Sequence, residues 1–167
     1  MMRNGAVLDT GFLITLVDAN RDAHEHAKAY YRYFRENGIT LYLPTVVASE
    51  FGIKQPVTDL PLHHFTILPF NLAESIRSAD LNCAYYRSKA GSGQRDAVKD
   101  DFKIIAQAEE QEAMFLLTED ANSMSIYCDL LRNESRIDFK VIEVSKGFDI
   151  SFVNGNGQTE MKYPSAD

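Results

Sequence analysis

The chain has 167 residues, of which 45% are hydrophobic and 25% are charged, a balance that favours one folded domain and excludes a disordered polymer. No apolar run approaches the roughly 20 residues of a membrane-spanning helix, and two cysteines are too few for a disulfide framework, so we expect reduced thiols in a cytoplasmic protein. The net charge of −7 argues against a nucleic-acid partner. A bound divalent cation would reverse the sign of the charge locally, so net charge alone does not exclude such a partner.

Short apolar segments alternate with helical patterns along most of the chain. The predicted strands are 5–8, 40–43, 64–70, 113–117 and 139–144, and the predicted helices are 12–17, 21–37, 44–51, 71–89, 100–112 and 121–132. This alternation favours an α/β fold with a mainly parallel sheet. We expect a packed domain over residues 1–146. Residues 147–167, which include the turn signal Asn154-Gly155-Asn156-Gly157, are expected to form a C-terminal extension, as a hairpin or a disordered tail.

Two acidic residues follow predicted strands directly. Asp9 comes after the first strand, and Asp120 comes after the fourth. Ligands of parallel sheets bind outside the carboxyl ends of the strands, where the strand order reverses. If these two strands are neighbours, Asp9 and Asp120 meet over one crevice.

Glu50 has an unusual place within a predicted helix. Val46 and Val47 precede it by four and three residues, and Ile53 follows it by three. These spacings put Glu50 on the apolar stripe of its helix. A bare glutamate there is costly unless something pairs with it.

Asp101 shows the same pattern, because Ile105 and Ala108 follow it on the same helical face. Its neighbour Asp100 stays open as an alternative ligand, but helical phase turns that residue about 100° away. A helix cap is the simpler explanation for Asp101 alone, as it is for Asp9 and Asp120. A cap cannot explain Glu50, which lies in mid-helix.

The four acids Asp9, Glu50, Asp101 and Asp120 would repel one another in one crevice and raise each other's pKa. A hard divalent cation removes this repulsion, and Mg²⁺ and Mn²⁺ prefer carboxylate and water oxygens. A metal held in this way can activate water and stabilise charge on a phosphoryl group. The sequence therefore gives a physical reason for these four carboxylates to lie together around a divalent cation.

Four segments resemble, in order, the four motifs of the PIN domain family. They are Val7-Leu8-Asp9-Thr10-Gly11-Phe12-Leu13-Ile14, Leu43-Pro44-Thr45-Val46-Val47-Ala48-Ser49-Glu50-Phe51, Asp101-Phe102-Lys103-Ile104-Ile105-Ala106-Gln107-Ala108 and Leu117-Thr118-Glu119-Asp120. The resemblance runs from about Ala6 to Val144. It implies a three-layer α/β/α sandwich with a five-stranded, mainly parallel sheet in the order 3-2-1-4-5, which makes residues 1–146 a PIN-like nuclease domain.

The same resemblance implies cleavage of RNA with Mg²⁺ or Mn²⁺, often by the toxin of a toxin–antitoxin pair. Asp9, Glu50, Asp101 and Asp120 would then hold the metal, and Thr118 would position a carboxylate or a water. The partners expected on this basis are single-stranded RNA, an antitoxin protein and a second copy in a homodimer, with no membrane association.

Contacts to nucleic acid are expected near the motifs. Arg95 and Lys99 belong to a locally basic stretch before the third motif, and Thr10 follows the first acid, as Ser or Thr commonly does in the family. The alternative is a solvated face, because nearby acids dilute the positive charge.

Two other functions remain as alternatives. A non-catalytic PIN-like module that binds RNA or protein would have no physical reason to keep costly clustered charges. A metal-dependent phosphatase of another α/β family would need a second Asp two residues after the first, where this chain has Gly11.

Overall fold

The structure is a computed structural model that describes residues 3–91 and 95–154. Its five strands are β1 (Ala6–Leu8), β2 (Leu41–Pro44), β3 (Thr66–Leu68), β4 (Phe115–Thr118) and β5 (Lys140–Glu143). All adjacent pairs are parallel, and the order is β3-β2-β1-β4-β5. The predicted α/β fold and strand order are therefore confirmed.

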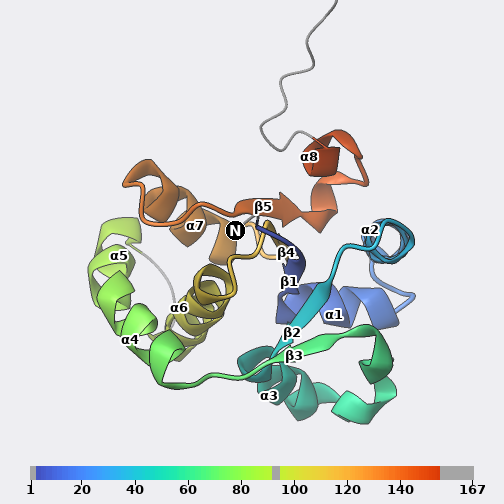
Figure 1. Ribbon diagram of the computed structural model, residues 1–167, viewed down its shortest axis with the longest axis horizontal. Helices are drawn as coiled ribbons and strands as arrows, with labels where there is room; N and C mark the ends of the chain where they lie inside the picture. The colour runs from blue at the N-terminus through green and yellow to red at the C-terminus, as the bar shows by residue number, and fades with distance from the viewer. Residues whose placement is uncertain (1–2, 92–94, 155–167) are drawn as a thin grey trace, which may run out of the picture.

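Helices cover the sheet on both sides, with α1 and α2 on one side and α4 to α7 on the other (Figure 1). The helices are α1 (Thr10–Val17), α2 (His24–Glu36), α3 (Thr45–Lys54), α4 (Leu72–Leu81), α5 (Cys83–Ala90), α6 (Arg95–Glu110), α7 (Met124–Asn133) and α8 (Ser151–Asn154), with three short 3₁₀ turns at Val57–Asp59, Leu62–His64 and Val144–Lys146. In the described residues, no helix is long and apolar enough to cross a membrane.

The core forms because the central strands are apolar on both faces. Every residue of β1 and β4 is buried, as expected for inner strands of a parallel sheet that helices cover on each side. Ala27, Tyr30 and Phe34 form the buried stripe of α2, and the ring of Phe34 stacks on Phe115 of β4 at 5.9 Å between centroids. These contacts fix α2 against the sheet.

The helix predicted over residues 71–89 is in fact two helices. Asn82 separates α4 from α5 in a left-handed conformation, with φ of 56°. Asparagine tolerates this conformation because its short side chain bonds to nearby backbone. The Asn82 side chain accepts a hydrogen bond from the N–H of Tyr85 and caps α5.

The helix predicted from residue 100 begins five residues earlier, at Arg95. Asp101 therefore lies within α6, so the simple explanation of this residue as a helix cap is wrong. The earlier start lengthens α6 toward the loop at Gly91.

The packed structure continues past residue 146. Val153 of α8 is buried, Phe148 packs edge-on against Tyr30, and the hydroxyl of Tyr33 donates to Asn154 at 3.0 Å. Residues 155–167, with most of the predicted turn signal, lie outside the described residues.

Candidate metal-binding active site

Asp9 lies at the carboxyl end of β1, where it caps α1. The N–H of Thr10 and the hydroxyl of Thr118 each donate to one of its carboxylate oxygens, both at 2.7 Å. The Asp9 side chain is buried, and loss of water raises its pKa to about 6 despite these two hydrogen bonds. Repulsion from Glu50 and Asp120 raises the pKa further.

Glu50 projects from α3 toward the start of α1, where its carboxylate accepts a hydrogen bond from the hydroxyl of Thr10. Burial is the main reason that its pKa is raised. Val47 is buried as predicted, but Ile53 is 84% exposed. The prediction that Ile53 shares the apolar stripe is therefore wrong, because the C-terminal turn of α3 leaves the core after Phe51.

Asp101 occupies the core-facing side of α6, and Ile105 and Ala108 on the same face are fully buried. The hydroxyl of Ser123 donates to its carboxylate. Burial raises the pKa of Asp101 to about 8, and the charges of the other three acids add to the effect. Asp100 pairs with Lys103 at 2.9 Å, and the charge of Asp100 raises the pKa of Glu50 while that of Lys103 lowers it.

Asp120 follows β4 and organises the turn that leads into α7. One carboxylate oxygen accepts the N–H groups of Asn122 at 2.8 Å and Ser123 at 2.9 Å, and the N–H of Asp120 itself donates to the hydroxyl of Thr118 at 2.9 Å. Asp120 therefore orders the turn before α7, whose N-cap residue is Ser123 and not Asp120, and it lies within the electrostatic reach of Asp9 and Asp101.

The four acids that the sequence singled out come from separate elements and interact electrostatically. The charges of Asp9, Asp120 and Glu50 raise the pKa of Asp101, and the charges of Glu50 and Asp120 raise the pKa of Asp9. Hydroxyl groups donate hydrogen bonds to three of these carboxylates. Thr10 donates to Glu50, Thr118 donates to Asp9, and Ser123 donates to Asp101. The result is a partly buried set of hard oxygen donors with excess negative charge.

The donor chemistry of the four acids suits Mg²⁺ or Mn²⁺. Over residues 3–91 and 95–154, however, no three His, Cys, Asp or Glu side chains are grouped closely enough to hold a metal ion. The carboxylates instead accept hydrogen bonds from neighbouring hydroxyl and N–H groups. The set therefore fits a divalent cation in ligand type and charge, with side-chain rotation needed to bring the oxygens onto one ion.

Sequence reasoning missed two features at this site. The first is Ser123, whose only signal was its spacing of three residues after Asp120. The second is Glu119, which accepts hydrogen bonds from Arg21 at 2.6 Å and from Thr15. Both depend on contacts between elements that are distant in the chain.

The three residues predicted to contact nucleic acid lie in different parts of the molecule. The hydroxyl of Thr10 donates a hydrogen bond to Glu50. Lys99 is exposed on α6, beside Arg87 and Cys83 around a small hollow. Arg95 begins α6, and its side chain lies outside the described part of the structure.

The parallel sheet places acids at the carboxyl ends of β1 and β4, where the strand order reverses and ligands of such sheets bind. Two solved structures share the fold. "Crystal structure of VapBC2 from Rickettsia felis bound to a DNA fragment from their promoter" matches 82% of this chain and 96% of its own, with a TM-score of 0.54 and 15% identity. "Crystal structure of DNA bound VapBC from Salmonella typhimurium" matches 85% and 98%, with a TM-score of 0.53 and 14% identity.

These likenesses confirm the predicted PIN-like fold. At such low identity they establish the fold alone. No protein-family model matches the sequence, and no curated protein matches it.

Proposed function

We propose that this protein is an endoribonuclease that hydrolyses single-stranded RNA with Mg²⁺ or Mn²⁺. The observation that carries the proposal is that Asp101, on the core-facing side of α6, lies within electrostatic reach of three further carboxylates, those of Asp9, Glu50 and Asp120, and has a pKa raised to about 8. Buried negative charge of this kind is costly to folding. A site that binds a cation gives the protein a physical reason to keep it.

Asp9, Glu50, Asp101 and Asp120 would hold the metal. When bound, such an ion activates water and stabilises the charge that develops on a phosphoryl group. Thr118 would keep Asp9 in place, and Ser123 would do the same for Asp101. These hydroxyls orient the carboxylates as outer-shell partners do at metal sites.

Single-stranded RNA is the proposed substrate because an exposed backbone reaches an open crevice more easily than a paired one. The solved structures that share the fold are VapBC complexes bound to DNA. By this analogy we propose that the protein is the toxin of a toxin–antitoxin pair, that an antitoxin protein is a partner and that it acts in the cytoplasm. Homodimer formation and residues 1–146 as the catalytic unit belong to the same proposal.

An RNA cleavage assay tests the proposal. Purified protein is incubated with unstructured and hairpin RNA, with Mn²⁺ or with chelator, beside the variants Asp101→Asn and Asp100→Asn. We expect Mn²⁺-dependent cleavage of the unstructured RNA that is lost in Asp101→Asn and retained in Asp100→Asn. Absence of cleavage of either RNA by the wild-type protein would reject the proposal.

A further inference from the structure

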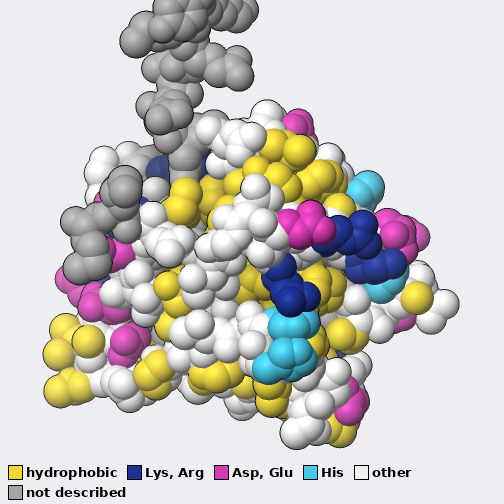
Figure 2. Space-filling view, turned by 45° about the vertical axis from the view of Figure 1, so that its right-hand side comes forward, with side chains coloured by type: hydrophobic (Ala, Val, Ile, Leu, Met, Phe, Trp, Pro, Cys, Tyr) yellow, Lys and Arg dark blue, Asp and Glu magenta, His cyan; other side chains and the backbone are white. Residues whose placement is uncertain are grey.

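A line of basic side chains follows one face of α2. Arg21 precedes the helix, and His24, Lys28, Arg32 and Arg35 recur every three or four residues, the spacing that places side chains on one helical face. We call these five residues the α2 stripe. Figure 2 shows basic side chains and histidines gathered on one face of a molecule whose net charge is −7.

The stripe begins at an ion pair with Glu119. Arg21 pairs with Glu119 at 2.6 Å, and Glu119 lies between Thr118 and Asp120 in the chain. The hydroxyl of Thr15 donates to the same carboxylate. Glu119 therefore fixes the first cation of the stripe against the segment that follows β4.

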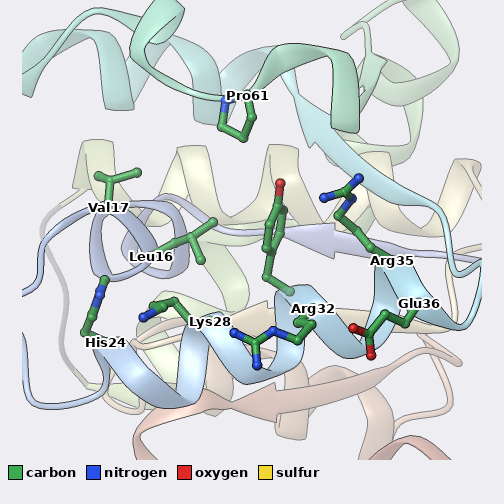
Figure 3. A pocket seen from close by; sticks show the side chains of 9 residues that line it. Leu16, Val17, His24, Lys28, Arg32, Arg35, Glu36 and Pro61 are labelled. Atoms are coloured by element: carbon green, nitrogen blue, oxygen red, sulfur yellow. The ribbon is translucent and has the colours of Figure 1, made fainter.

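An open pocket of about 640 Å³ adjoins the middle of the stripe, within the ~300–1,000 Å³ range of small-ligand sites. Pro61 lies across the pocket from α2, and Leu16 and Val17 of α1 lie toward one end (Figure 3). Tyr31 contributes an aromatic ring to the lining, and its hydroxyl is hydrogen-bonded to His64. The pocket thus combines apolar walls with a basic rim.

The positive charge on this rim is only partly neutralised. Lys28 pairs with Glu25 at 3.1 Å, and Glu36 also lines the pocket. Arg35 lies 5.7 Å from the centre of the Tyr31 ring. Arg32 lies within electrostatic reach of Glu25 but donates no hydrogen bond to the residues that the structure describes, so its N–H groups can bind an anion.

We propose that the α2 stripe and its pocket bind the RNA strand on its way to the acidic site. Phosphates contact Arg32 and Arg35, and one base lies against Tyr31 and Pro61. Aromatic rings beside a basic groove are the usual means of holding single strands without sequence preference. The inference rests on the proposed function, since it names where that substrate binds.

The length and charge of the α2 stripe favour RNA over an acidic polypeptide. The 13 residues of α2 span ~20 Å at 1.5 Å each, the length of about six stacked nucleotides at ~3.4 Å. One strand can therefore contact the whole stripe. RNA carries a phosphate at every nucleotide along that length, so it matches a row of cations better than a polypeptide with scattered acids.

Fluorescence anisotropy with a labelled 12-nucleotide single-stranded RNA tests the inference. All proteins carry Asp101→Asn to prevent cleavage, and Mg²⁺ is present throughout. We expect Arg32→Ala combined with Arg35→Ala to raise Kd at least tenfold and to lower the salt slope by about 1.4, because each phosphate contact in single strands contributes about 0.7. Tyr31→Leu raises Kd about tenfold at an unchanged salt slope, whereas Tyr31→Phe binds as the parent does.

Lys54→Ala is the matched control, because Lys54 is an exposed cation on α3 outside the stripe. Its Kd should stay within twofold of the parent. If the parent binds RNA and the double arginine variant binds it equally well, the inference is overturned and the pocket is left for an acidic polypeptide. If the parent binds no RNA but the wild-type protein still cleaves it with Mn²⁺, the inference alone is overturned. If the wild-type protein cleaves no RNA, the proposed function fails, so the two failures are distinguishable.

Discussion

Thr118 joins two of the four acids through a single hydroxyl. Its oxygen donates to Asp9 at 2.7 Å and accepts the N–H of Asp120 at 2.9 Å. Asp9 ends β1 and Thr118 ends β4, and these strands are neighbours in the sheet. One buried side chain thus holds two acids together where the strand order reverses.

Replacing Thr118 by Val keeps the shape of the side chain and removes both hydrogen bonds. We expect Thr118→Val to lower the free energy of unfolding by about 1–3 kcal/mol, the cost of leaving buried polar groups unpaired. Cleavage should slow about 10- to 100-fold, as when outer-shell partners of metal ligands are lost. Chemical denaturation and an RNA cleavage assay measure the two effects.

The control for Thr118→Val is Ser125→Ala. The Ser125 hydroxyl is buried, and it has no hydrogen-bond partner in the part of the chain that the structure describes. Its removal should leave stability and cleavage close to wild type. Full activity of Thr118→Val would contradict the role given to this threonine.

Ser123 tests whether the orientation of Asp101 matters for metal binding. Ser123→Ala removes the hydroxyl that donates to Asp101, but the backbone N–H that donates to Asp120 remains. We expect about tenfold weaker Mn²⁺ binding by calorimetry and recovery in Ser123→Thr. Equal affinity in the alanine variant would show that Ser123 has no positioning role.

Stability without metal should depend on pH through Asp9 and Asp101. An unfolded aspartate has a pKa of about 3.9, while the folded values are raised to about 6 and about 8. Between pH 4 and pH 8 the folded protein thus binds more protons than the unfolded chain, so stability falls as pH rises. The slope is at most about 1.4 kcal/mol per pH unit for each carboxyl that titrates.

Urea denaturation in chelator from pH 5 to pH 8 measures this slope. Excess Mn²⁺ should flatten it, because the cation replaces the protons as the partner of the carboxylates. A stability in chelator that rises over this range would contradict burial as the dominant effect on these two groups.

Asp101→Asn should separate stability from metal binding. The substitution removes a buried charge and leaves an amide oxygen that can still accept from Ser123. In chelator at pH 8 we expect a gain of about 1–3 kcal/mol, seen as a melting temperature several degrees higher. Mn²⁺ should raise the melting temperature of the wild-type protein but not that of the variant, and a destabilised variant in chelator would argue against uncompensated charge at this position.

The fold was predictable because its signals are local. The apolar strands at residues 5–8 and 113–117 and the helices between them set the alternation that defines a parallel sheet. The break at Asn82 was not predictable, because the composition of residues 71–89 is helical throughout and the left-handed residue depends on how α4 and α5 pack.

The core-facing position of Asp101 was predictable from helical phase, since Ile105 and Ala108 on the same face are buried. The prediction that Ile53 is buried failed because residue spacing alone cannot show where a helix leaves the core. The α2 stripe and its pocket were missed because the pocket needs Leu16 and Pro61, which come from segments outside α2.

The central claim is that four acids from separate elements form one divalent-metal site. Calorimetric titration with Mn²⁺ of the wild-type protein, Asp101→Asn and Asp100→Asn tests it most directly, because the two variants remove the same charge one residue apart. We predict saturable binding by the wild-type protein and Asp100→Asn, and its loss in Asp101→Asn. Equal binding by all three proteins, or no binding by the wild-type protein, would contradict the claim.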